Sequence, residues 1–203
     1  VITDNDTNYP QTGIYVVGGP VYGCVVDGAM LNCVSQVDAV ENCIFKNWGK
    51  TNAIYEAVSA NSGTLGVKNC AFIGDSTNAV QSIEISTVPN AAIYNNIFMN
   101  VDSGVYFHTA FNAAARLLGC NAFYNATTHY EKTGSSSYEL DNVTQIDFTD
   151  MDIDLDEDPF VDQANHNYHL KANSVCRGRG LVFPHNYAGY LKSGGNSVAT
   201  PAT

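Results

Sequence analysis

Short runs of alternating apolar and polar residues, separated by Asn and Gly, make up much of the 203-residue chain. Apolar side chains alternate in residues 54–58, 80–85 and 105–107, which is the spacing of a strand with one buried face. Val, Ile, Tyr and Phe are plentiful and Leu is scarce, a composition that favours strands over helices. The pattern predicts an all-β protein.

A six-residue pattern recurs along the chain. It has an apolar residue at its fourth position, Cys or Asn at its second and Asn or Gly at its sixth. Four copies begin at residues 42, 69, 95 and 120, which are 27, 26 and 25 residues apart, and a weaker copy begins at residue 23. A period in the twenties is typical of proteins in which each repeat is one unit stacked on its neighbours. The leucine framework of a leucine-rich repeat is absent, so a unit of strands and turns fits better.

Stacking the repeats places equivalent residues above one another in two ladders on the inward face, because side chains alternate with a period of two. The apolar ladder contains Val26, Phe45, Phe72, Phe98 and Phe123. The second ladder contains Cys24, Cys43, Cys70, Asn96 and Asn121. The sixth position is occupied by Gly28, Asn47, Gly74, Asn100 and Asn125. These residue types tolerate the left-handed backbone that a sharp corner between strands requires.

We therefore expect a right-handed parallel β-helix of about five to six coils, spaced by roughly 4.8 Å, with an irregular C-terminal cap. Residues 1–12 are expected to form an N-terminal extension, residues 13–180 the β-helix including its terminal coil, and residues 181–203 a C-terminal tail. A β-sandwich with a chance repeat is the alternative fold.

The end of the repeat region has its own motif. Residues 158–162 read Asp-Pro-Phe-Val-Asp, and residues 168–170 and 174–180 follow with a short strand pattern and a turn. With the Asn-x-x-Phe-x-Asn repeats, this ending resembles the right-handed parallel β-helix superfamily of pectate-lyase-like proteins, especially its secreted or phage-associated members. Val175 stands where Pro is usual in that ending. The resemblance covers residues 13–180 and implies a fold more than a function, since one fold hosts many activities.

The charge balance excludes some partners. Nine Lys and Arg stand against 20 Asp and Glu, a net charge of −11, which argues against nucleic acid and against anionic membrane surfaces. No apolar run approaches the roughly 20 residues of a membrane span. We expect no nucleic-acid partner and no membrane insertion, and a location that is extracellular, on a cell surface or on a virion.

The resemblance implies enzymes that cleave acidic polysaccharides, but a chain this acidic with few cations is a poor host for a polyuronate. The remaining catalytic candidates are His108, Arg116 and Tyr106, which could act as base, charge clamp and acid. An ordinary solvated loop is the favoured interpretation, because a lone His does not make a catalytic constellation. Whether the protein is an enzyme stays open at this stage, with the balance against it.

Two sets of residues are candidates for metal binding or thiol chemistry: a row of aspartates and the six cysteines. Asp152, Asp154, Asp156 and Asp158 alternate and could hold Ca²⁺ on one face of a strand, but a solvated acidic strand is the favoured interpretation. No other cofactor is indicated. The six cysteines contain no Cys-x-x-Cys pair, so we expect free thiols stacked in register, while Cys24 and Cys43 could also form a disulfide between coils.

Outward aromatic residues are the candidates for sugar binding, because rings offer stacking platforms. They are Trp48, Tyr55, Tyr94 and Tyr124. Residues 1–11 offer no amphipathic helix to cap the first coil, so we expect protein subunits to cover it, in a homo-oligomer or a larger assembly. The predicted function is a non-catalytic structural or adhesive module, such as a decoration, fibre or assembly component. A polysaccharide lyase or hydrolase is the alternative, and a carbohydrate-binding module is the third hypothesis.

Overall fold

The computed structural model describes residues 2–3, 12–15, 19–28, 32–35, 37–48, 55–60, 64–74, 80–85, 90–107, 115–132, 145–148 and 151–180. Apart from short 3-10 segments near the C-terminal end, such as Gln163–Asn165, the regular elements in these residues are strands. Nineteen of them form three parallel sheets, here named A, B and C.

Sheet A contains β1 (Ile2–Thr3), β4 (Val25–Asp27), β7 (Ile44–Lys46), β10 (Ala71–Ile73), β13 (Ile97–Met99), β16 (Ala122–Tyr124) and β19 (Ile153–Asp154). Sheet B contains β2 (Thr12–Tyr15), β5 (Asn32–Ser35), β8 (Tyr55–Ala60), β11 (Val80–Ile85), β14 (Ser103–Phe107) and β17 (Thr128–Lys132). Sheet C contains β3 (Pro20–Tyr22), β6 (Ala39–Glu41), β9 (Thr64–Lys68), β12 (Asn90–Tyr94), β15 (Ala115–Gly119) and β18 (Gln145–Phe148).

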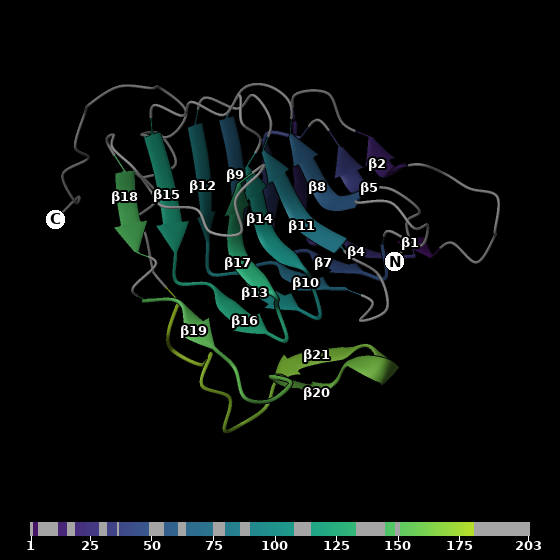
Figure 1. Ribbon diagram of the computed structural model, residues 1–203. Helices are drawn as coiled ribbons and strands as arrows, with labels where there is room; N and C mark the ends of the chain where they lie inside the picture. The colour runs from purple at the N-terminus through teal and green to yellow at the C-terminus, as the bar shows by residue number, and fades with distance from the viewer. Residues whose placement is uncertain are drawn as a thin grey trace, which may run out of the picture.

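Successive strands enter sheets A, B and C in rotation, so every third strand is a hydrogen-bonded neighbour (Figure 1). We call one passage through the three sheets a circuit. The all-β prediction and the prediction of parallel strands are confirmed, and the arrangement is compatible with a β-helix.

The register of sheet A stacks the repeat residues. Val26 is paired with Phe45, and Phe45, Phe72, Phe98 and Phe123 are paired in that order. The ring centroids of successive Phe residues lie 5.2, 5.1 and 5.1 Å apart in stacked orientation. A repeat period of 25 to 27 residues therefore returns the chain to the same place on the sheet.

Left-handed backbone occurs on both sides of the short sheet A strands. At the sixth position of the repeat, Asn47, Asn100 and Asn125 have φ between 53° and 55°, and Gly28 has φ 91°. Gly74, at the equivalent position, does not have a positive φ. The first position is left-handed as well: the residues are Gly23, Asn42, Asn69, Asn95 and Cys120. Asn is favoured there because its short polar side chain lowers the cost of this conformation.

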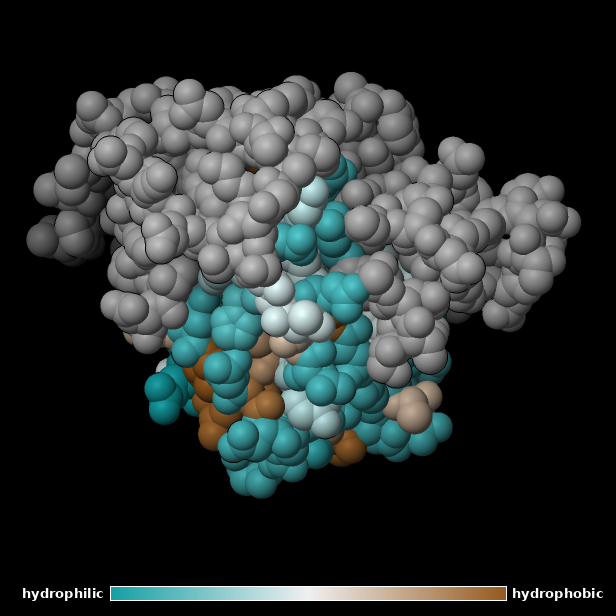
Figure 2. Space-filling view, in the orientation of Figure 1, coloured by the Kyte–Doolittle hydropathy of each residue, from teal (hydrophilic) through white to brown (hydrophobic). Residues whose placement is uncertain are grey.

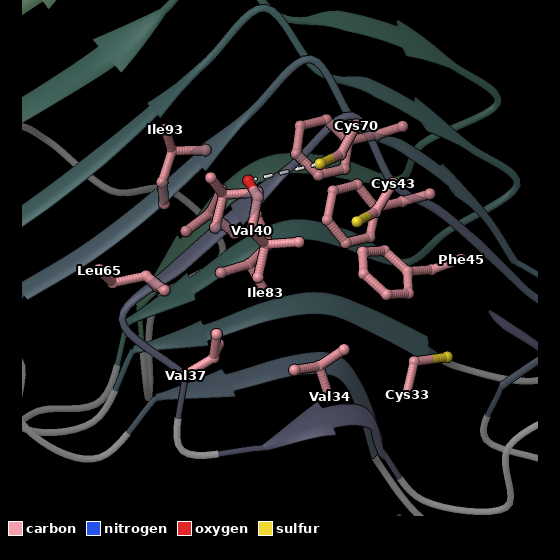
Figure 3. Packing of buried hydrophobic residues seen from close by; sticks show 14 of the residues in the cluster. Cys33, Val34, Val37, Val40, Cys43, Phe45, Leu65, Cys70, Ile83 and Ile93 are labelled. Carbon is pink, nitrogen blue, oxygen red and sulfur yellow. Dashed lines mark hydrogen bonds between the residues drawn. The ribbon is translucent and has the colours of Figure 1, made fainter. Parts of the chain in front are cut away.

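Residues from all three sheets share one interior. Val34 and Ile83 reach it from sheet B, Val40 and Ile93 from sheet C, and the Phe ladder from sheet A (Figure 3). These side chains are buried, and β-branched residues predominate among those from sheets B and C, as pleated surfaces favour.

The C-terminal segment contains an antiparallel hairpin. β20 (Phe160–Asp162) and β21 (Asn167–Leu170) form an antiparallel pair that extends none of the three parallel sheets. Phe160 packs with Ala71, Ile73 and Met99, which belong to the outer face of sheet A. Sheet A is therefore covered on its outer face by this hairpin, which lies below β13 and β16 in Figure 1. The physical reason is that β10 carries apolar residues on both faces.

Candidate functional site

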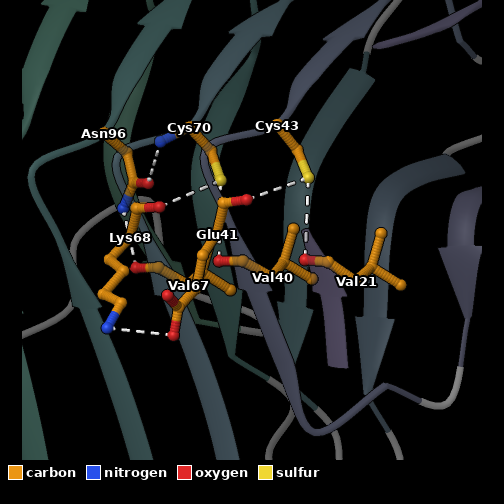
Figure 4. Close-up of polar contacts among 8 residues, drawn as sticks. All are labelled: Val21, Val40, Glu41, Cys43, Val67, Lys68, Cys70 and Asn96. Carbon is orange, nitrogen blue, oxygen red and sulfur yellow. Dashed lines mark hydrogen bonds and ion pairs between the residues drawn. The ribbon is translucent and has the colours of Figure 1, made fainter. Parts of the chain in front are cut away.

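The second ladder carries hydrogen bonds between circuits at the corner from sheet C to sheet A (Figure 4). Asn96 Oδ1 accepts from the N–H of Cys70 at 3.0 Å, and Asn96 Nδ2 donates to the carbonyl of Val67 at 3.0 Å. Asn121 repeats the arrangement with the N–H of Asn96 and the carbonyl of Ile93, at 3.0 and 3.3 Å. Each side chain thus satisfies backbone groups of the preceding circuit, which buried backbone requires.

Cysteines occupy the same positions in earlier circuits. Cys43 Sγ lies 3.4 Å from the backbone nitrogen of Cys24 and 3.7 Å from the carbonyl oxygen of Val21. Cys70 Sγ lies 3.6 Å from the carbonyl oxygen of Val40. The thiols therefore follow the contact pattern of the asparagine amides, and none of the six cysteines forms a disulfide.

Cys43 and Cys70 differ in acidity. A hydrogen bond from the Cys70 thiol lowers the pKa of Cys43 to about 7, burial acts in the opposite direction, and the N–H of Cys24 adds to the lowering. Burial raises the pKa of Cys70 well above its usual value. The pKa values of the two stacked thiols are therefore shifted in opposite directions.

Two of the predicted metal ligands end the ladders. Asp152 Oδ1 accepts from the N–H of Asn121 at 2.8 Å, and Asp152 Oδ2 accepts from the hydroxyl of Tyr130 at 2.8 Å. Asp154 is paired with Phe123 in the register of sheet A, and its carboxylate lies 2.8 Å from His129 Nε2. The His129 ring stacks on Phe123 with centroids 3.8 Å apart. Asp152 therefore continues the polar ladder, and the His129–Asp154 pair covers the apolar one.

The other two carboxylates lie elsewhere. Asp158 accepts from the N–H of Phe160 at 2.8 Å and from Gln163 Nε2 at 2.9 Å, and Asp156 is exposed. Within the described residues, no three His, Cys, Asp or Glu side chains lie where they could hold a metal ion together. The four aspartates therefore do not form the single row of ligands that the sequence suggests.

A groove runs between the sheet C to sheet A corner and the C-terminal segment. Its volume is about 400 Å³. The floor contains Ile44, Ala71, Ile97, Ala122 and Ile153, one residue from each successive circuit. Asn42, Asn69 and Asn95 line the corner, while Phe160, Tyr168, Leu170, Cys176, Arg179 and Gly180 belong to the C-terminal segment. In Figure 2 apolar surface is gathered low in the view, where the described sheet A strands and the hairpin lie.

The groove differs in charge from the whole protein. The chain carries a net charge of −11, yet the described residues that line the groove include no Asp, Glu or His, and Arg179 is the charged residue among them. Four of the six cysteines line it: Cys43, Cys70, Cys120 and Cys176. The groove therefore combines amides, thiols, aromatic rings and one guanidinium.

The aromatic rings that the sequence suggests for sugar binding lie in different environments. Trp48 is fully buried and its Nε1 donates to the carbonyl of Gln81 at 2.9 Å, so this ring is not available to a sugar. The prediction of an outward Trp48 is therefore wrong. Trp48 follows a corner of the chain that turns its side chain into the interior, where it packs against Phe72. Tyr124 is half-buried and packs with the outer cluster under the hairpin. Tyr94 is half-buried as well, and burial raises its pKa.

The predicted catalytic residues are not brought together by the described structure. His108 lies outside the described residues. Arg116 is on β15, opposite Ala91 and Gln145, and Tyr106 is half-buried on β14, opposite Glu84 and Glu131. These strands belong to different sheets. For Arg116 and for Tyr55 on β8, the structure describes the backbone only.

Sequence patterns did not reveal the groove. Tyr168, Arg179 and the corner asparagines line it together only because the hairpin folds back on sheet A. The one available signal was the run of apolar residues on both faces of β10, which indicates a covered outer face.

Comparisons with protein-family models, with curated proteins and with solved structures give no match for this chain. Among the described residues, no helix combines the length and apolar composition that crossing a bilayer demands.

Proposed function

We propose that this chain is a right-handed parallel β-helix of about five to six coils that serves as a non-catalytic structural or adhesive module, on an extracellular, cell or virion surface. The observation that carries the proposal is the use of polar side chains. Asn96, Asn121, Asp152 and Tyr130 hydrogen-bond to one another or to backbone, and so hold the circuits together. The side chains of Asp152 and Tyr130, which are of types that enzymes use in catalysis, are thus engaged in hydrogen bonds that support the fold.

The superfamily of pectate-lyase-like β-helices remains part of the proposal. It is supported by the rotation of strands through three parallel sheets and by the Asn-rich corners. The acidic charge supports a surface role over polyuronate cleavage, because an anionic substrate would be repelled.

Sizing with light scattering, together with intact mass, tests the structural function. We expect a trimer or larger assembly of the 21.8 kDa chain, because β1, β2 and β3 pair with a described strand on one side only, and such edges favour a covering subunit. A uronate-release assay on acidic polysaccharides is the companion measurement, and we expect no turnover. A stable monomer that releases uronate would replace the structural function with the lyase or hydrolase alternative.

A second candidate function is glycan binding, which the groove favours. Asn side chains recur along it at the spacing of circuits, Tyr168 offers a ring, and Arg179 adds donors, with no carboxylate among the described lining residues. Affinity electrophoresis in neutral and acidic polysaccharide gels tests it. We expect retardation that Tyr168→Ala weakens about five-fold, the loss of roughly 1 kcal/mol of ring contact, while Tyr168→Phe retains it. Equal mobility in all gels would exclude this function.

A further inference from the structure

Thiols are concentrated in one part of the molecule. Four of the six cysteines line the groove at the sheet C to sheet A corner, and no carboxylate or imidazole belongs to the part of its lining that the structure describes. Thiolate sulfur is a soft ligand that selects soft metal ions such as Cu(I), whereas hard ions prefer oxygen. The chemistry of the lining therefore favours a soft ion over Ca²⁺ or Mg²⁺.

The register of sheet A makes two of these thiols neighbours. Ile44 is paired with Ala71 in parallel register, and the N–H of Ala71 bonds to the carbonyl of Cys43 at 2.9 Å. Cys43 and Cys70, the residues before this pair, are therefore stacked one circuit apart, and their sulfur atoms point the same way in Figure 4.

The spacing decides what the pair can hold. Adjacent parallel strands are about 4.8 Å apart, a spacing within the Cα range of a disulfide, but both cysteines are free thiols in this structure. Two metal–thiolate bonds of about 2.3 Å in line span about 4.6 Å. An ion bound by the two sulfurs would displace both thiol protons, which now face carbonyl oxygens: Cys43 Sγ lies 3.3 Å from that of Glu41 and Cys70 Sγ lies 3.2 Å from that of Lys68.

We propose that Cys43 and Cys70 form a two-coordinate site for a soft monovalent ion, of which Cu(I) is the biological example, reached through the groove. An ion that requires tetrahedral coordination does not fit this pair, because no three ligating side chains of the described residues converge. Both cysteines are at most 2% exposed, so a bound ion is shielded from solvent.

The site admits a matched set of variants. Asn occupies the same ladder position in the next two circuits and makes the same backbone contacts. Cys43→Asn and Cys70→Asn therefore remove sulfur while keeping the ladder. Cys176→Ser removes another thiol of the groove and is the control for nonspecific binding.

Silver ion is the probe, because it mimics Cu(I) without redox chemistry. The reduced protein is titrated with Ag(I) in excess glutathione and the retained ions are counted by native mass spectrometry. We expect one retained ion in the unmutated protein and in Cys176→Ser. Its affinity should fall at least about 100-fold in either Asn variant, since two linked ligands gain that much over one.

Silver-edge X-ray absorption on the unmutated protein is the second measurement, which needs no variant to fold. We expect two sulfur neighbours and no nitrogen or oxygen in the first shell. The proposal is overturned if the unmutated protein retains no ion in glutathione, if an Asn variant retains it equally, if Cys176→Ser loses it, or if the absorption spectrum shows nitrogen or oxygen ligands.

Discussion

At the scale of single residues, stability depends on ladder side chains that satisfy backbone groups at a corner. Asn96 is 1% exposed and bonds to the N–H of Cys70, the carbonyl of Val67 and the amide oxygen of Asn121. A buried backbone group that loses its partner costs about 1–3 kcal/mol. The ladder positions are therefore more sensitive than their polar character suggests.

Replacing Asn96 tests this sensitivity. Asn96→Ala orphans the Cys70 N–H and the Val67 carbonyl, and we expect it to lower the free energy of unfolding by roughly 2–4 kcal/mol. Asn96→Cys, the residue type of the preceding circuits, should lose less than half as much. Urea denaturation measures both. Equal losses in the two variants would show that the ladder contacts do not carry the effect.

Cys33 provides a test of pH dependence at one residue. Burial raises the pKa of its thiol above the ordinary value of 9.0, and the negative charge of Asp27 adds to the rise. The unfolded thiol ionises above pH 9 while the folded one stays protonated, so its contribution to stability is complete below pH 9 and is lost as pH rises further.

The expected slope is about 1.4 kcal/mol per pH unit for this thiol. Unfolding free energies of the unmutated protein and of Cys33→Ala, measured between pH 8 and 10.5, should converge as pH rises. A constant difference between the two proteins across that range would contradict the assignment. The tyrosines and the other cysteines titrate in both proteins and cancel in the comparison.

At the scale of elements, β14 packs tightly against β17 and the last ring of the Phe ladder. A Cβ added to Gly104 would lie 2.7 Å from the carbonyl oxygen of His129 and 2.7 Å from a ring carbon of Phe123. The backbone of β17 and a buried ring must both move to accept it. Gly66 on β9 has nothing within 4 Å of the same added atom.

The two glycines form a matched pair of variants. We expect Gly104→Ala to destabilise the protein by roughly 1–3 kcal/mol, the usual cost of overpacking. Gly66→Ala should stay within about 0.5 kcal/mol of the unmutated protein. Thermal unfolding followed by circular dichroism compares them. Similar melting temperatures for both variants would mean that β14 and β17 relax more easily than this packing implies.

At the scale of the whole molecule, the hairpin is a separate layer on the circuits. It is joined to sheet A through Phe160, Tyr168 and Leu170, and Lys46 Nζ donates to the carbonyl of Gln163 at 3.3 Å. The interior behind sheet A is filled by another cluster. The hairpin can therefore open without emptying the interior, as local unfolding units do.

Phe160→Ala tests that independence. Phe160 is 4% exposed and contacts Tyr168 edge-on with centroids 5.9 Å apart. Its truncation should cost roughly 3–5 kcal/mol of local stability, enough to open the hairpin. Hydrogen exchange should show lost protection in β20 and β21 and unchanged protection in β11 and β14. A uniform loss across all strands would instead show that hairpin and circuits unfold together.

Much of the architecture could be predicted from the repeat. Phe45, Phe72, Phe98 and Phe123 are spaced by the length of one circuit, so their pairing follows from the spacing. The candidate site could not be predicted in the same way. Tyr168 and Asn69 line the same groove although they are far apart in the sequence and belong to no common repeat.

The sequence by itself determined the parallel stacking and its two ladders, because a regular period repeats the same local geometry and brings like residues together. Tertiary structure alone decided the roles of Trp48 and Asp152, since the one turns inward and the other completes a ladder. It also decided the groove and its paired thiols. Their neighbours come from different circuits and from the folded-back hairpin, and no local pattern along the chain encodes such a contact.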